Sequence, residues 1–191
     1  MKKKLLFALL IILTSNSFSQ DSKFSLELNF PIPFGNNLIG QNYNGIVDLG
    51  ASYKFANIAP INIGASLNTG ILINNANLIN RFPNFNVISY VIQPKVFGEL
   101  NLGLLENFHP SLGLGYTVII TSANNRSDII DLPNNTESGI NFNLGLAYDI
   151  TQKLFIKSQY DFIKLSANDN SVNNKFNTNV NILKIGFGYR F

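Results

Sequence analysis

The residue types that most readily support catalysis are scarce in this chain, and the best candidate is the pair His109 and Ser111. The chain has one histidine and no cysteine. On a strand, residues two positions apart share a face, so the His109 imidazole could act as a general base toward the Ser111 hydroxyl. The alternation around this pair points both side chains inward, beside a short turn. We therefore prefer a structural role for both residues.

Carboxylates could hold a hard cation such as calcium, since the lack of cysteine and the single histidine leave mainly oxygen ligands. Asp128 and Asp131 lie in the longest loop, and Asp169 lies between Asn168 and Asn170. Their spacing lacks the glycine and the terminal glutamate of an EF-hand loop, so we interpret them as solvated acids. The sequence predicts no catalytic residue, no cofactor and no metal site.

Period-two alternation of apolar and polar residues runs through most of the chain and predicts strands with one apolar and one polar face. In the last such segment, Leu183, Ile185 and Phe187 alternate with Lys184 and Gly186. The predicted strands are 23–32, 45–55, 61–71, 86–101, 108–120, 139–150, 154–164 and 181–191.

The segments between the predicted strands alternate in length. The long ones are rich in Asn, Gly, Pro and Ser; they are 34–44, 72–85, 121–138 and 165–177. The short ones are 56–60, 102–107 and 151–153. An antiparallel meander places every second connection at the same end, so one end has long loops while the other has tight turns and both termini. This asymmetry is typical of transmembrane β-barrels.

Pro94 lies in the middle of its predicted strand, where it cannot donate a hydrogen bond to the ladder. We expect a bulge there, or a split of the strand into two shorter pieces.

Charged residues make up only 13% of the chain, against about 25% in ordinary soluble domains. A soluble barrel of this size needs a charged exterior, so the composition favours an exterior that faces lipid. Many aromatic residues of the apolar face lie near strand ends, where they would form interfacial girdles. They are Phe30, Tyr53, Phe55, Tyr90, Tyr116, Tyr148, Phe162, Tyr189 and Phe191.

The polar face combines small residues with a balanced set of charges. Its acids are Glu27, Asp48, Glu99, Asp149 and Asp161, and its bases are Lys54, Lys95, Lys157, Lys184 and Arg190. Eight strands leave an interior only wide enough for side chains to fill, and buried charges must be paired. Lys157 and Asp161 share a face, and Glu27 and Lys184 lie on the two strands that meet at closure. We hypothesise that paired charges plug the lumen.

The first residues resemble a secretory signal. Lys2, Lys3 and Lys4 precede an apolar run, and Ser17-Phe18-Ser19 offers a cleavage site before Gln20. We expect a signal peptide over 1–19 and one barrel domain over 20–191. Without the three lysines, the chain has 11 basic and 11 acidic residues. This balance gives no basic patch for nucleic acid.

The chain resembles the small bacterial outer-membrane β-barrel families, the porin-like barrel domain similar to OmpX and the OmpA transmembrane region. The resemblance rests on the signal, the alternating strands, the loop asymmetry and the terminal segment 186–191. It implies an all-β, eight-stranded antiparallel up-and-down transmembrane β-barrel in the bacterial outer membrane. It also implies that Phe187, Tyr189 and Phe191 form a signal for the barrel-assembly machinery, and that outer-membrane lipid and lipopolysaccharide surround the barrel.

Four functions remain open from the sequence. We expect a structural or surface-interaction role that uses the long loops, because binding residues often sit on loops over a rigid scaffold. The alternative is a narrow, porin-like transport barrel for small solutes. A lipid-modifying enzyme is disfavoured by the single histidine. The last possibility is a soluble secreted barrel that binds a ligand inside.

Overall fold

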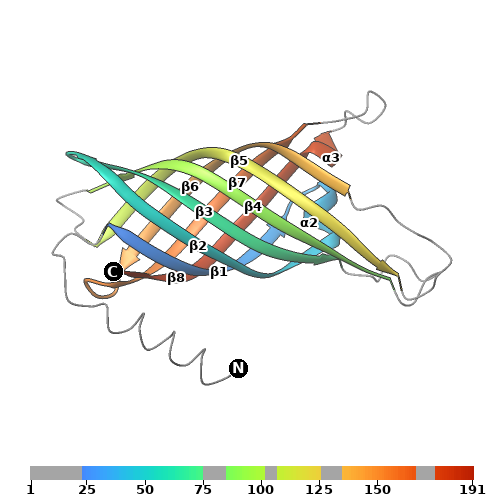
Figure 1. The fold of residues 1–191 in the computed structure, drawn as a ribbon, viewed down its shortest axis with the longest axis horizontal. Helices are drawn as coiled ribbons and strands as arrows, with labels where there is room; N and C mark the ends of the chain where they lie inside the picture. The colour runs from blue at the N-terminus through green and yellow to red at the C-terminus, as the bar shows by residue number, and fades with distance from the viewer. Residues whose placement is uncertain (1–22, 75–84, 102–106, 126–134, 167–174) are drawn as a thin grey trace, which may run out of the picture.

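The computed structural model describes residues 23–74, 85–101, 107–125, 135–166 and 175–191, which form a single closed barrel (Figure 1). The predicted signal segment 1–19 and the acids Asp128, Asp131 and Asp169 lie outside these residues. The strands are β1 (Phe24–Phe34), β2 (Tyr43–Ile58), β3 (Ile61–Asn74), β4 (Phe85–Leu100), β5 (Phe108–Asn125), β6 (Asn135–Asp149), β7 (Leu154–Leu165) and β8 (Asn179–Arg190). Two short helices are α2 (Leu38–Asn42) and α3 (Lys175–Thr178).

Each strand pairs in antiparallel fashion with its neighbours in the chain, and β1 pairs with β8 to close the ring. At closure, Leu28 lies opposite Phe187 and Phe34 lies opposite Asn181. This arrangement confirms the predicted eight-stranded antiparallel up-and-down barrel. No helix in the described part of the chain is long and apolar enough to cross a membrane.

The two ends of the barrel differ as the loop lengths predict. The strand ends that the short connections join (β2 to β3, β4 to β5 and β6 to β7) lie at the end that also holds the start of β1 and the end of β8. The strand ends that the long connections join (β1 to β2, β3 to β4, β5 to β6 and β7 to β8) lie at the opposite end, where Figure 1 shows α2 and α3. We call these the tight-turn end and the loop end.

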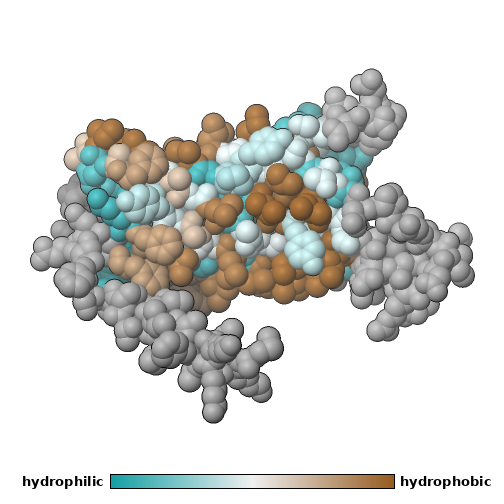
Figure 2. Space-filling model, viewed as in Figure 1, coloured by the Kyte–Doolittle hydropathy of each residue, from teal (hydrophilic) through white to brown (hydrophobic). Residues whose placement is uncertain are grey.

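Side chains alternate between the wall and the interior along every strand, because successive Cβ atoms point to opposite faces. On β6, the apolar side chains of Ile140, Phe142 and Leu144 are exposed, while Asn141 and Asn143 between them are buried. Figure 2 shows apolar residues gathered along the barrel wall. An outer wall this apolar, around a polar interior, suits a barrel surrounded by lipid rather than water.

The strands extend beyond the predicted bounds, most of all at the loop end. Segments 43–44 and 121–125 belong to β2 and β5 although they were predicted as loops. Helix α2 was not predicted; it begins after Asn37, whose side-chain Oδ1 accepts a hydrogen bond of 2.7 Å from the Gly40 backbone N–H. Asparagine is among the preferred residues at this position because its side chain satisfies a free helical donor.

The prediction of a bulge or split at Pro94 is wrong. Strand β4 is continuous from Phe85 to Leu100, and Pro94 lies opposite Leu67 of β3. On the β5 side, pairing is recorded on either side of Pro94 and resumes in the same register. The sheet therefore accommodates the missing donor without an extra residue. The register shifts lie in β2 instead, between Gly45 and Val47 and between Lys54 and Ala56.

Candidate functional site

The polar lumen is the candidate site, because the structure directs all ten predicted charged residues into it. Eight of them come from β1, β2, β4, β7 and β8, where they alternate with apolar residues of the wall. Glu99 lies near the end of β4, and Asp149 is the last residue of β6. All ten are buried or half-buried. The set consists of Glu27, Asp48, Lys54, Lys95, Glu99, Asp149, Lys157, Asp161, Lys184 and Arg190.

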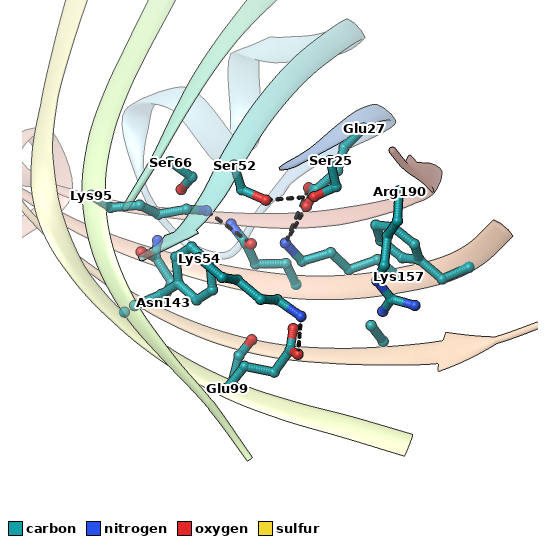
Figure 3. A pocket seen from close by; sticks show the side chains of 16 residues that line it. Ser25, Glu27, Ser52, Lys54, Ser66, Lys95, Glu99, Asn143, Lys157 and Arg190 are labelled. Atoms are coloured by element: carbon teal, nitrogen blue, oxygen red, sulfur yellow. Dashed lines mark hydrogen bonds and ion pairs between the residues drawn. The ribbon is translucent and has the colours of Figure 1, made fainter. Parts of the chain in front are cut away.

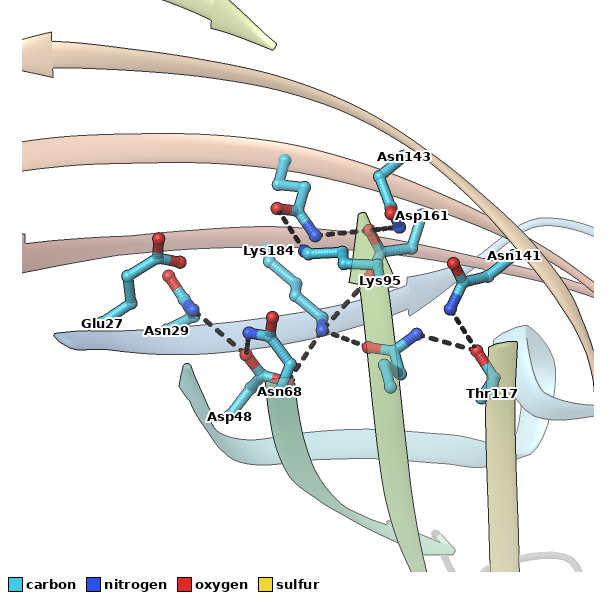
Figure 4. A network of polar contacts seen from close by, with 12 residues as sticks. Glu27, Asn29, Asp48, Asn68, Lys95, Thr117, Asn141, Asn143, Asp161 and Lys184 are labelled. Carbon is cyan, nitrogen blue, oxygen red and sulfur yellow. Dashed lines mark hydrogen bonds and ion pairs between the residues drawn. The ribbon is translucent and has the colours of Figure 1, made fainter. Parts of the chain in front are cut away.

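A central cluster forms around Lys184 of β8 (Figure 4). Its Nζ lies 2.7 Å from Asp48 Oδ2 and 3.1 Å from Asp161 Oδ2, and it donates a hydrogen bond to Gln93 Oε1. The side chains of Lys184, Asp48 and Asp161 are 2%, 1% and 0% exposed. One ammonium group therefore joins β2, β4 and β7 across the interior.

Amide side chains satisfy the remaining carboxylate oxygens of the central cluster. Asn29 and Asn68 donate to Asp48 Oδ1 at 3.0 and 2.8 Å. Asp161 Oδ1 accepts hydrogen bonds from Asn143 at 2.7 Å and from Gln159 at 2.6 Å. A buried carboxylate is tolerated only when its charge and its lone pairs find partners. These four amides make it possible for two carboxylates to share one lysine.

Two further ion pairs lie on the tight-turn side of the central cluster (Figure 3). Lys157 Nζ is 3.0 Å from both carboxylate oxygens of Glu27. Lys54 pairs with Glu99. Glu27 and Lys184 do lie on adjacent strands, as expected, but each binds a partner elsewhere in the lumen. Lys157 and Asp161 share a face of β7 and likewise take different partners.

Of the ten lumen charges, Lys95 is the one without a recorded ion pair. Its Nζ donates a hydrogen bond to Gln159 Oε1 at 2.9 Å. It lines a cavity of about 30 Å³ together with Ser66 and Asn143. Ser66 Oγ and Asn143 Oδ1 are buried without a hydrogen-bond partner among the described residues. A polar cavity of this size has room for ordered water, which would satisfy both atoms.

At the tight-turn end the lumen opens into a polar basin of about 460 Å³. Arg190 Nη1 lies 2.6 Å from Asp149 Oδ1, and its guanidinium carbon lies 4.4 Å from the centre of the Phe155 ring. His109 Nε2 lies 2.9 Å from Asp149 Oδ2, and His109 Nδ1 lies 3.2 Å from Asn101 Oδ1.

The structure does not bring His109 and Ser111 together as a base and a nucleophile. Both ring nitrogens of His109 are within hydrogen-bond distance of Asp149 and Asn101. Ser111 instead lines the small cavity deeper in the lumen. Among the described residues, no group of three or more His, Asp or Glu side chains could hold a metal ion.

An apolar layer fills the loop end of the lumen, and the sequence reasoning missed it. Its residues continue the inward phase of the polar residues on the same strands: Ile163 and Leu165 follow Asp161 on β7, and Ile182 precedes Lys184 on β8. The alternation alone could have shown these positions. We use the name apolar layer for Ile39, Leu72, Val91, Ile119, Ile163, Leu165, Val180 and Ile182.

The predicted assembly signal lies on the outer wall at the tight-turn end. Phe187 is exposed, and the ring centre of Phe191 lies 5.0 Å from that of Tyr189 and 5.7 Å from that of Phe24. These aromatic contacts join the two ends of the barrel sequence on one patch of wall. Their role in assembly stays a prediction.

The fold matches several solved outer-membrane barrels at low sequence identity. Ail, the attachment invasion locus protein of Yersinia pestis, aligns with a TM-score of 0.58 and 14% identity over 88% of this chain and 97% of that chain. For OprG of Pseudomonas aeruginosa the TM-score is 0.56 and the identity 13%, over 89% and 96%. The N-terminal β-barrel domain of P. aeruginosa OprF aligns with a TM-score of 0.55 and 12% identity over 90% of this chain and 98% of that chain. A search of curated protein sequences found no match.

The family assignment agrees with the geometry. The model of one protein family, described as the outer membrane protein beta-barrel domain, matches residues 5–191. That range includes every strand of the barrel. With its closed antiparallel ring, apolar wall and polar lumen, the chain belongs to the family of outer membrane protein beta-barrel domains.

Proposed function

We propose that this outer-membrane barrel is closed to steady passage of ions and has a structural or surface-interaction role. The observation that carries the proposal is the central cluster. Lys184, Asp48 and Asp161 span the lumen and are almost completely buried. An ion that passed this level would have to displace paired charges, and leaving a buried charge without its partner costs about 3–5 kcal/mol.

Two other layers of the interior support the same proposal. On the tight-turn side, the cavity next to Lys95 has a volume of only about 30 Å³. On the loop side, the apolar layer fills the interior with hydrocarbon side chains, and a hydrated ion would lose its water there. In our proposal, the polar basin at the tight-turn end is therefore closed at its inner end and does not continue through the barrel.

Planar-bilayer recording tests the closed lumen. The purified, refolded protein is expected to give no large, steady single-channel steps. A variant that hollows both the central cluster and the apolar layer, with Asp48, Asp161, Lys184, Ile119 and Ile163 all replaced by alanine, is expected to conduct and serves as the positive control. Heat-modifiable migration on a detergent gel checks that both proteins are folded. Large, steady steps from the unmodified protein would refute the proposal.

Solute uptake separates the structural role from the alternative, a narrow porin-like transport barrel. Liposomes that contain the protein are expected to take up small sugars no faster than empty liposomes. Entry at the rate given by the hollowed variant would favour transport.

The loop end is the proposed interaction surface, since a rigid barrel holds its long connections together at one face. Ail is, by its name, an attachment protein, and we propose the same broad class of role here on the basis of the loop asymmetry. A whole-cell binding assay with connection 126–134 shortened to a tight turn, compared with the same change in 101–107, tests it. Loss of surface binding in the first variant alone is expected.

We also propose that segment 1–19 is cleaved on export, that Phe187, Tyr189 and Phe191 engage the barrel-assembly machinery, and that outer-membrane lipid and lipopolysaccharide contact the wall. N-terminal sequencing of protein from outer membranes is expected to begin at Gln20. Substitution Phe191→Ala is expected to lower the assembled fraction, with Phe162→Ala as the control. Mature protein that retains Lys2 would contradict the cleavage.

We infer that the barrel does not use His109 and Ser111 as a catalytic pair. The support is that Asp149 and Asn101 lie within hydrogen-bond distance of the two ring nitrogens of His109. The variant Ser111→Ala is expected to leave the lipid A acylation pattern of intact cells unchanged in mass spectra. A changed acylation pattern would support the hypothesis that the protein is a lipid-modifying enzyme.

A further inference from the structure

The wall of the barrel has a seam between β1 and β2 in its loop half. Recorded pairing of these strands runs from Phe24 opposite Tyr53 to Asn29 opposite Asp48 and goes no further. The other edge of β1 stays paired with β8 up to Phe34 opposite Asn181. Residues 30–34 of β1 and 43–47 of β2 therefore face each other outside the recorded ladder. We use the name β1–β2 seam for these two stretches.

Two prolines explain the seam. The Lys23 backbone carbonyl accepts a hydrogen bond from the Lys54 N–H of β2, whereas the Phe24 carbonyl accepts one from the Phe191 N–H beside β8. Main-chain groups alternate in direction along a strand, so odd-numbered residues of β1 face β2. Pro31 and Pro33 are both odd-numbered, and neither has an N–H to donate. The even-numbered residues keep their donors for β8.

Close packing holds the seam shut in place of a ladder. A Cβ added to Gly45 of β2 would lie 1.7 Å from the Pro31 carbonyl oxygen. The bare glycine backbone thus rests directly on β1, beside the register shift between Gly45 and Val47. Recorded strand pairing is absent along this stretch and two of its donors are missing, so we infer that the seam is a weak junction of the wall.

Both sides of the seam are mainly apolar, and Asn44 is its one exposed amide. On the lipid side, Phe30, Ile32 and Ile46 are exposed. On the lumen side, Gly45 lies opposite Leu72 of β3 and Pro33 lies opposite Ile182 of β8. Leu72 and Ile182 both belong to the apolar layer. A molecule that crossed the seam would pass from lipid to the apolar layer without meeting a charged side chain of the wall.

Helix α2 connects the two strands of the seam and places Ile39 in the apolar layer. The helix is five residues long, and a helix this short has little stability of its own. It follows Gly35, which has a positive φ of 93° that glycine adopts without strain. Ile39 is the buried hydrophobic side chain of α2, Asn37 caps its first turn, and Gly40 packs against the Phe34 carbonyl of β1, which would lie 2.4 Å from an added Cβ.

We propose that the apolar layer is a binding site for an unbranched acyl chain, which enters laterally through the β1–β2 seam and displaces Ile39 of α2. The layer is apolar and lies in the loop half of the lumen, behind the part of the wall that would meet outer-leaflet lipid. An acyl chain supplies flexible hydrocarbon of the kind that the layer buries. The polar cluster below it, centred on Lys184, sets the depth that the chain reaches. This site is independent of ion conduction, because it does not open the central cluster.

The experiment uses acyl probes with a diazirine near the methyl end, on the refolded protein in lipid nanodiscs. One arm uses a diazirine fatty acid and the other a phosphatidylethanolamine with the same chain, since the chain could come from either source. After irradiation, mass spectrometry maps the labels. We expect labels on the inward residues Leu72 and Ile119, besides those on the outward residues Leu67 and Ile140. The arm that gives inward labels identifies the source.

Matched variants test the route. Replacing Pro31 and Pro33 by valine restores two donors toward β2 and is expected to lower inward labelling about tenfold, the factor that two ordinary hydrogen bonds supply. Pro94→Val is the control: it lies on β4 between the polar residues Gln93 and Lys95 and should leave inward labelling unchanged. Ile39→Ala vacates part of the layer and should raise it.

The outcomes separate clearly. Inward labels that fall in the Pro31 and Pro33 variant and persist in Pro94→Val support the proposal. Labels confined to outward residues in both the unmodified protein and Ile39→Ala overturn the site. Undiminished inward labels in the folded proline variant overturn the seam as the route. If that variant does not show heat-modifiable migration, it is not folded. The proposal is then tested by comparing inward labelling in Ile39→Ala with inward labelling in the unmodified protein.

Discussion

Replacing Lys184 by methionine is expected to destabilise the barrel far more than the same change at Lys95. Lys184 neutralises two carboxylates, Asp48 at 2.7 Å and Asp161 at 3.1 Å, and all three side chains are almost completely buried. Removing one partner of a buried ion pair costs about 3–5 kcal/mol because the other charge is left without compensation. Two carboxylates lose their cation here, so the loss should lie at the upper end of that range.

Lys95 is the matched comparison, because it is also a buried lysine of the lumen. Its recorded partner is the neutral oxygen of Gln159 at 2.9 Å. Loss of such a bond costs about 1–3 kcal/mol, and the methionine also removes the cost of burying a charge. Lys95→Met should therefore be close to neutral. The expected difference between the two variants is at least about 2 kcal/mol, more than a tenfold change in the unfolding equilibrium.

Urea unfolding of the protein in lipid vesicles measures both values, followed by circular dichroism because the chain has no tryptophan. Adding Asp48→Asn to Lys184→Met removes one uncompensated charge and should recover part of the loss. Equal losses at Lys184 and Lys95, or no recovery in the double variant, would refute the account of the central cluster.

Two further substitutions probe the apolar layer and the seam. Ile163 is 0% exposed, and Ile163→Ala is expected to lower the free energy of unfolding by about 2–5 kcal/mol in the same assay because it leaves an enclosed cavity. Ile185→Ala on the lipid face should lower the free energy of unfolding less. Equal losses in the two variants would contradict the tight packing of the apolar layer. Gly45→Ala is expected to lower the yield of heat-modifiable, folded protein sharply, because its Cβ would lie 1.7 Å from the Pro31 carbonyl oxygen. Gly98→Ala is the control, since the nearest atom to its Cβ would be 3.5 Å away. A similar loss of folded protein in the control would contradict the explanation by close packing at Gly45.

Period-two alternation was sufficient to predict the strands and which of their side chains point inward, while the closed, eight-stranded topology was predicted from the resemblance. It gives the face of a residue but not its level along the barrel axis, which depends on strand tilt and register. For this reason the pairing of Glu27 with Lys157, and of Lys184 with both Asp48 and Asp161, did not follow from the sequence.

The apolar layer was missed for a related reason. Residues such as Ile163 and Val180 are inward by phase, but an apolar residue on a polar face carries no marker of the level at which it lies. Pro94 led to the wrong prediction of a bulge or split strand. A residue without a backbone donor interrupts a strand only where the pairing on either side of it does not keep the strand in register. Pro31 and Pro33 lie near the end of β1, and the recorded ladder with β2 stops beside them.

The ion pairs of the lumen bear on the order in which the barrel is built. Glu27 of β1 reaches Lys157 of β7, and Asp48 of β2 reaches Lys184 of β8, so each pair spans the junction between the first and the last strand. No chain connection joins β1 to β8, and neither pair can form until that junction closes. An incomplete sheet therefore carries uncompensated charges on its concave face. The chain gains their mutual neutralisation only in the final step, which favours complete rings over open sheets in the membrane.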